Sequence, residues 1–228
     1  MSIFGGPDIK TDGLVLHLDA ANRKSYPLSG STIYDLSGNG NNGTFGASTA
    51  APTFSGDNGG GLTFNGDDRI DNNNFTLHQI NAGTLEWWVK TPSVLATLMY
   101  IGGVGGTTTY GATRVIRVWN GMFSLVHYGG GTNEDWNSII PVSTNTLYHL
   151  VQTWNGISVS LYVNNTGYSN TRSGLITPTG TNLSLGISPF NTSAFWIGKI
   201  YTMRLYNKAL NELEIEQNYN ALKGRYGL

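Results

Sequence analysis

Residues Tyr34 to Phe45 read YDLSGNGNNGTF, and they follow a short apolar segment, Gly13 to Leu18, that reads GLVLHL. Glycine and asparagine accept positive φ angles and close tight turns, so this run predicts a shaped loop and excludes helix and central strand. The apolar segment before it predicts a short β-strand. We therefore expect an ordered loop beside an early strand.

The oxygen-bearing side chains of this loop have the spacing found in the first half of a calcium-binding loop. Asp35, Ser37 and Asn39 occupy alternate positions, as the ligands of such a loop do. A bidentate acid is expected at the twelfth position, but Gly46 stands there. The alternative is an Asx-type turn, in which the side chains of Asp35 and Asn39 satisfy backbone amides. The missing acid favours the turn, and calcium held by Asp35, Ser37 and Asn39 is the competing hypothesis.

The composition is typical of a β-rich chain with many turns. The protein has 228 residues, 31 of them glycine, 12% charged side chains, a net charge of −1 and no cysteine. All-β sandwiches of roughly 200–250 residues commonly form one domain, so the length does not require two. The scattered charge predicts neither nucleic acid nor an anionic membrane as partner, and the lack of cysteine excludes disulfides and zinc–thiolate sites.

Apolar residues recur with a period of two along most of the chain. In the segment TLEWWVK, residues 84–90, one face carries Leu85, Trp87 and Val89. The other face carries Glu86, Trp88 and Lys90, so this segment predicts a half-buried strand. Further strands are predicted at residues 61–65, 97–102, 182–187 and 196–206. Together these segments favour a large antiparallel sandwich.

Two Asn-Gly pairs, at residues 120–121 and 155–156, each lie between alternating segments. Asn-Gly supplies both positive-φ residues of a type I′ turn, so each pair predicts a β-hairpin. In the second hairpin, Trp154 would then pair with Ile157. The side chains predicted to face the core in this hairpin are Tyr148, Leu150, Trp154, Ile157, Val159, Leu161 and Val163.

A helix is predicted near the end of the chain. Asn211 is placed as its N-cap, and Glu214 occupies the capping-box position three residues later. We expect this short amphipathic helix to cover one edge of the sandwich. Residues 1–12 precede the first strand and predict an N-terminal arm, and residues 13–228 predict a single domain.

Several segments, taken in order, carry a resemblance to a known family. They are GLVLHLDAAN, YDLSGNGNNGTF, GGLTFNGDDRI, GTLEWWVK, LYHLVQTWNGISVSLYVNN and GKIYTMRLYNKALNELEIEQNY. This set resembles the concanavalin A-like lectin/glucanase jelly roll in its laminin-G-like form, and the resemblance covers nearly the whole chain. The opening segments are similar to the version found in tailed-phage virion proteins. The resemblance implies an all-β, two-sheet jelly roll, whose members bind sugars, bind proteins or hydrolyse glucans.

Catalysis can be tested against the sequence. Glucanases of this fold carry Glu-x-Asp-x-x-Glu on one strand, because two carboxylates must face the sugar. The sequence contains no such string, and its four histidines show no metal-ligand spacing. We therefore expect a protein that is not an enzyme.

A sugar site would need an exposed aromatic platform among polar groups at a loop. Trp136, within GGGTNEDWNS, fits best, and Tyr110 is a second candidate. Trp88 is a third, because Trp87 should take the core side of the same strand. The alternative is that Trp136 folds over the sandwich edge or contacts a neighbouring subunit.

The resemblance implies a non-enzymatic virion component, displayed on the outside of a phage particle as a capsid decoration protein. Such a protein would assemble in the host cytoplasm, bind other virion subunits and sit on the shell as a homo-oligomer. Ile3 and Phe4 in the arm would anchor it, unless the arm is a frayed terminus or an added edge strand. The rival hypothesis is a carbohydrate-binding module of a tail or head fibre that recognises host surface glycans.

Overall fold

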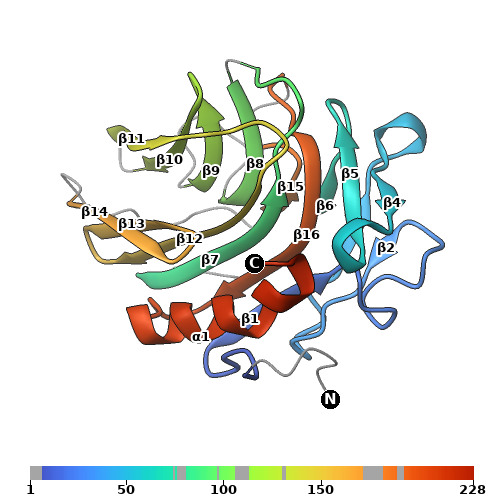
Figure 1. Cartoon of the computed structure of the whole chain (residues 1–228), viewed down its shortest axis with the longest axis horizontal. Helices are drawn as coiled ribbons and strands as arrows, with labels where there is room; N and C mark the ends of the chain where they lie inside the picture. Colours follow the sequence, from blue (N-terminus) through green and yellow to red (C-terminus); the bar gives the residue numbers. More distant parts are fainter. Residues whose placement is uncertain are drawn as a thin grey trace.

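The computed structural model describes residues 7–73, 75, 81–96, 98–105, 113–129, 132–171, 182–188 and 193–228. The strands form two antiparallel sheets that pack face to face (Figure 1). Sheet A contains, in spatial order, β14 (Thr166–Thr171), β13 (Ser158–Val163), β12 (Leu147–Asn155), β7 (Ala82–Lys90), β16 (Ile197–Tyr206), β5 (Gly61–Asn65) and β4 (Thr53–Ser55), and β1 (Leu14–Asp19) also pairs with β16. Sheet B contains β11 (Thr132–Pro141), β10 (Met122–Gly129), β9 (Thr113–Trp119), β8 (Leu98–Gly105), β15 (Asn182–Leu185), β6 (Ile70–Asn72), β3 (Gly43–Phe45) and β2 (Thr32–Ile33).

The remaining elements are short. They are the 3-10 turns η1 (Ser48–Ala50), η2 (Asp57–Gly59) and η3 (Gly224–Tyr226), and the helix α1 (Glu212–Lys223). The fold class predicted from the sequence, an all-β sandwich with a short C-terminal helix, is confirmed. Within the described residues, no helix combines the length and the apolar character that a membrane crossing requires.

The main core lies between the two sheets, as the alternation predicts. From β7 it takes Leu85, Trp87 and Val89, all fully buried. The prediction that β7 is half-buried is wrong, because Glu86 and Trp88 on its opposite face are also buried. That face is covered by the C-terminal part of the chain, which the alternation within β7 cannot indicate. Each face of β7 therefore packs against protein.

The first predicted hairpin is confirmed. Asn120 and Gly121 have φ angles of 49° and 74°, and Trp119 pairs with Met122 across them. These positive φ values give the turn the twist that its strands require.

The register predicted for the second hairpin is wrong. Asn155 stays in β12 and pairs with Ser158, so the turn residues are Gly156 and Ile157. Gly156 has a φ of 59°, and its amide donates to the carbonyl of Asn81 at 2.9 Å, which fixes the turn one residue later. Ile157 is consequently 41% exposed and outside the core. The later turn leaves each remaining side chain on the sheet face predicted for it. The other six predicted core residues of this hairpin pack in the main core.

The helix begins as predicted. The side chain of Asn211 accepts a hydrogen bond from the amide of Glu214 at 3.0 Å, and Glu214 accepts one from the amide of Asn211 at 3.1 Å. The position of α1 differs from the prediction, because it lies over the outer face of sheet A and not over an edge (Figure 1). Ile215 packs there against Val151 and Tyr206 of the sheet. This apolar contact explains why the helix covers the face.

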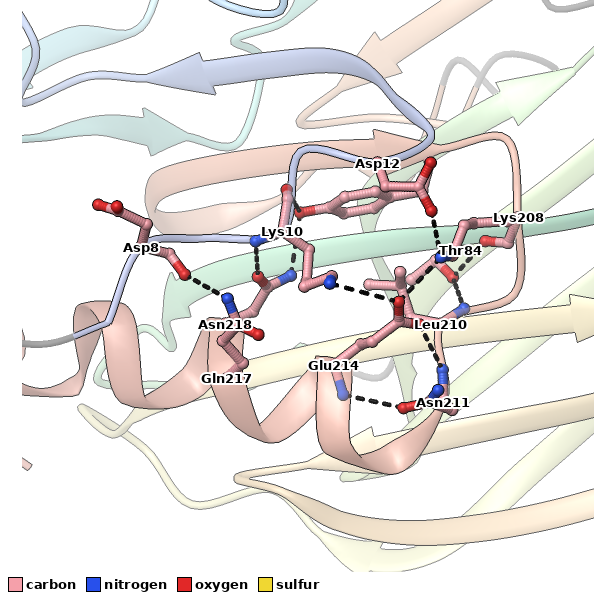
Figure 2. A network of polar contacts seen from close by, with 11 residues as sticks. Asp8, Lys10, Asp12, Thr84, Lys208, Leu210, Asn211, Glu214, Gln217 and Asn218 are labelled. Atoms are coloured by element: carbon pink, nitrogen blue, oxygen red, sulfur yellow. Dashed lines mark hydrogen bonds and ion pairs between the residues drawn. The ribbon is translucent and has the colours of Figure 1, made fainter.

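The second half of the predicted arm lies along α1 (Figure 2). The side chain of Gln217 donates to the carbonyl of Asp8 at 2.7 Å, and the amide of Lys10 donates to Asn218 at 2.8 Å. Asp12 pairs with Lys208 at 2.7 Å, just before the helix. Residues 8–12 are thus bound to the domain. The proposed anchors Ile3 and Phe4 lie outside the described residues, and the boundary between arm and domain remains a prediction.

Candidate functional site

The outer face of sheet A is closed by a buried ionic cluster. Glu86 lies at its centre, where it accepts hydrogen bonds from Arg204 at 2.8 Å and from the side chain of Asn218 at 2.8 Å. His149 Nε2 lies 2.9 Å from the same carboxylate. Burial alone would raise the pKa of Glu86, but the Arg204 charge with the bonds from His149 and Asn218 lowers it to about 2. This carboxylate therefore holds α1 on the sheet and is not exposed to a ligand.

Trp88, a candidate for glycan or partner contact, is buried under the same helix. Its ring stacks on Tyr219 with centroids 5.6 Å apart and lies 4.5 Å from that of Tyr226. Its exposed fraction is 0%. The prediction that Trp88 contacts a ligand at the surface is wrong, because α1 and η3 occupy the position of that ligand.

The other two aromatic candidates lie elsewhere. Trp136 is in the edge strand β11, where a loop was expected, and it pairs with Leu125 of β10. Its half-buried side chain packs against the main core, as in the alternative that folds it over the sandwich edge. Tyr110 falls outside the described residues. Glycan contact by Trp136 and Tyr110 remains a prediction.

The loop after β2 is organised by Asp35. Its Oδ1 accepts from the amides of His17 and Ser37, both at 2.9 Å. Its Oδ2 accepts from the Ser37 hydroxyl at 2.7 Å and from the Asn41 amide at 3.0 Å. These bonds make the Asx-type turn that was one of the two hypotheses. Asn39 behaves differently from that hypothesis, because its Nδ2 donates to the carbonyl of Val15 at 3.3 Å.

Calcium coordination by Asp35, Ser37 and Asn39 remains a prediction. Among the described residues, no three His, Cys, Asp or Glu side chains group together as metal ligands. Both Asp35 oxygens already accept hydrogen bonds from the protein. An ion would have to compete with these donors.

Replacing Asp35 by alanine is expected to lower the free energy of unfolding by about 2 kcal/mol, because four donors lose a charged acceptor. Urea unfolding measures this loss, and Asp67→Ala is the matched control because the Asp67 side chain is exposed. We expect calcium and chelator to leave the melting temperature of the wild-type protein unchanged. A calcium-dependent rise that Asp35→Ala abolishes would contradict the turn and establish an ion site.

A polar pocket of about 510 Å³ lies beside this loop, at the end of sheet B formed by β3 and β6. We call it the asparagine pocket. It is lined by Gly40, Asn41, Asn42, Thr44, Phe45, Gly46, Ala47, Arg69, Asp71, Asn72 and Asn73.

Strand alternation explains how the pocket is built. Thr44 pairs with Asp71, and both lie on the outer face of sheet B. Phe45 pairs with Ile70, and both of their side chains enter the core. The core residues thereby fix the strands, and the polar residues between them are presented outward.

The charged groups of the pocket are already paired. Arg69 Nε lies 3.0 Å from Asp71 Oδ2, and the hydroxyl of Ser184 donates to Asp71 Oδ1 at 2.8 Å. The amide of Asp35 donates to Asn42 Oδ1 at 2.9 Å. Within the described part of the chain, the Nδ2 donor of Asn42 has no protein partner. The pocket thus offers amide groups at fixed positions and carries no net charge.

The sequence prediction missed this pocket. Its two walls, residues 40–47 and residues 69–73, are far apart in the sequence and come together only through the β3–β6 pairing. The run Asp71-Asn72-Asn73 was the one local signal, and turn-forming composition explains such a run equally well. The structure places Asp35, a candidate calcium ligand, behind the pocket wall at Asn41 and Asn42.

Comparisons with solved structures agree with a lectin-like binding fold. Domain 4 of AbnA, an extracellular GH43 arabinanase from Geobacillus stearothermophilus, was solved in complex with arabinotriose and superposes with a TM-score of 0.70 and 19% identity, over 91% of this chain and 98% of that one. The binding domain of Paraclostridial Mosquitocidal Protein 1 superposes with a TM-score of 0.69 and 18% identity, over 92% of this chain and 52% of that one. The Trypanosoma rangeli sialidase in complex with sialic acid superposes with a TM-score of 0.66 and 16% identity, over 92% of this chain and 33% of that one. This chain therefore spans about half of the toxin domain and a third of the sialidase.

These identities are low, so the solved structures establish the fold alone. The architecture is that of a lectin-like jelly roll. The family model described as the concanavalin A-like lectin/glucanases superfamily, in its laminin-G type, matches residues 56–216, and the chain belongs to this family. No curated protein sequence gives a significant match.

Proposed function

We propose that the protein is a non-enzymatic carbohydrate-binding domain and that its ligand is a neutral saccharide held in the asparagine pocket. The observation that carries this proposal is the pocket itself, whose lining residues include four asparagines, a threonine, an arginine and an aspartate. Amide groups both donate and accept hydrogen bonds, as sugar hydroxyls require. The arabinotriose in the AbnA domain supports a saccharide ligand on this fold.

The charges of the pocket support a neutral ligand. Arg69 and Asp71 already neutralise each other across 3.0 Å. The pocket lining therefore has no excess positive charge that would favour an anionic sugar over a neutral one. Glycoside hydrolysis needs two carboxyl groups, and Asp71 is the single carboxylate among the described lining residues. This supports binding without cleavage.

A glycan array tests the proposal. We expect the wild-type protein to retain neutral glycans, and Asn72→Ala combined with Asn73→Ala to weaken that binding about tenfold or more, since each lost hydrogen bond is worth about 1 kcal/mol. Asn170→Ala is the matched control, because Asn170 is an exposed asparagine on β14 of the other sheet. Absence of any glycan binding, or full binding by the double variant, would overturn the proposal.

We further propose that this domain acts on the exterior of a phage particle, as a capsid decoration protein bound to other virion subunits. The opening segments, residues 13–22 and 34–45, support this setting through their resemblance to tailed-phage virion proteins. An electron-microscopy map of the particle tests it, with many copies expected on the outer shell. Location on a tail or head fibre would favour a host-recognition module instead, and absence from purified particles would overturn the setting.

A further inference from the structure

Tyr34 is an exposed aromatic residue beside the asparagine pocket. Its exposed fraction is 45%, more than that of any other aromatic side chain in the part of the chain whose burial is described. Large aromatic surfaces in a folded domain are normally covered, because each removes a large apolar area from water. Tyr34 thus presents an aromatic surface to solvent.

The register of β2 and β3 indicates where Tyr34 lies relative to the pocket. Thr32 pairs with Thr44 and Ile33 with Gly43, and one further step in this antiparallel register would bring Tyr34 opposite Asn42. Burial alternates accordingly, since Ile33 is 2% exposed whereas Tyr34 is exposed. The described lining includes Asn42 and not Tyr34, so Tyr34 would lie on the outer face of sheet B next to the pocket wall.

The backbone of Tyr34 is held in place on both sides. Its amide donates to the carbonyl of Ser25 at 2.7 Å, and its carbonyl accepts from the buried Ser25 hydroxyl at 2.7 Å. The next residue, Asp35, is fixed by the four hydrogen bonds described above. The backbone at Tyr34 therefore loses little further conformational freedom when a ligand binds.

We infer that Tyr34 is the stacking platform of the asparagine pocket and contacts the C–H face of a neutral sugar ring whose hydroxyls are held by the pocket amides. The inference deepens the proposed function and rests on it. A sugar ring has an apolar C–H face and a polar rim, and a saccharide that extends from the pocket past Asn42 would meet the exposed Tyr34. Aromatic rings have the flat apolar surface that such a face requires. Asp35 follows Tyr34 directly, and its carboxylate accepts a hydrogen bond from the amide of Asn41 in the pocket wall.

Two substitutions at one position test the inference, with isothermal titration of the neutral array glycan that the wild-type protein binds most tightly. Tyr34→Ala is expected to weaken binding about tenfold or more, and Tyr34→Phe, which keeps the ring, to stay within about twofold of wild type. Tyr168→Ala is the matched control, because Tyr168 lies on β14 of the other sheet. Urea unfolding of all variants separates lost binding from lost folding.

The outcomes distinguish this inference from the proposed function. If the asparagine double variant loses binding and Tyr34→Ala retains it, the stacking role is overturned while the saccharide site stands. If Tyr34→Phe binds as weakly as Tyr34→Ala, the hydroxyl and not the ring carries the contact, and the inference also fails. If the wild-type protein retains no glycan, the proposed function and the stacking inference are both overturned.

Discussion

Replacing Glu86 by glutamine is expected to lower the free energy of unfolding by about 3–5 kcal/mol, because the change leaves the buried charge of Arg204 without its partner. Glu86 and Arg204 are each 1% exposed, so water cannot replace the lost carboxylate. The same change weakens the bond from Asn218, by which α1 is held on sheet A. The substitution therefore also weakens the polar contact between α1 and sheet A.

Urea unfolding at neutral pH measures this effect. Glu216→Gln is the matched control, since Glu216 is an exposed glutamate on the same helix and its loss should cost less than about 0.5 kcal/mol. A loss below about 1 kcal/mol for Glu86→Gln would show that the cluster does not hold the helix in place.

The stability of the protein is expected to fall by about 2 kcal/mol between pH 7.5 and pH 5, chiefly through His17. Burial, followed by the charge of Arg204, lowers the pKa of His17 from 6.5 to about 3. Its Nε2 is buried and has no hydrogen-bond partner among the described residues. Between these two pKa values the unfolded chain binds a proton that the folded protein does not, so acid favours unfolding. The stability that depends on neutral His17 is fully present above pH 6.5, and it is lost progressively as the pH falls toward 3.

The variant His17→Gln isolates this contribution, because glutamine does not titrate. Thermal and urea unfolding across the pH range should show a flatter profile for the variant between pH 7.5 and pH 5. Glu86, whose pKa is lowered from 4.5 to about 2, adds its own loss only below about pH 4.5. Parallel profiles for variant and wild type above pH 5 would rule out His17 as the source.

The sequence predicts the fold well because its signals are local. The strand at residues 84–90, the Asn120-Gly121 turn and the Asn211 cap each depend on neighbours within a few residues, and all three are confirmed. The second hairpin was shifted because Gly156 bonds to Asn81, a residue far away in the sequence. The burial of Glu86 and Trp88 was missed for the same reason, because the cover comes from α1 at the other end of the chain.

The candidate site was harder to predict. Its strands β2, β3 and β6 have only two or three residues each, too few to show a period of two. The two walls of the pocket meet only because β3 and β6 pair. The spacing of oxygen-bearing side chains that begins at Asp35 is compatible with an ion site and with a turn, and the hydrogen bonds to Asp35 show the turn.

The central claim is that a neutral saccharide binds in the asparagine pocket, and backbone amide NMR shifts during titration with the tightest-binding neutral array glycan test it most directly. We predict that the shifted amides gather in residues 40–47 and 69–73, the two walls of the pocket, and at Tyr34. Shifts that gather instead around Trp136 on β11, with the pocket amides unmoved, would contradict the claim.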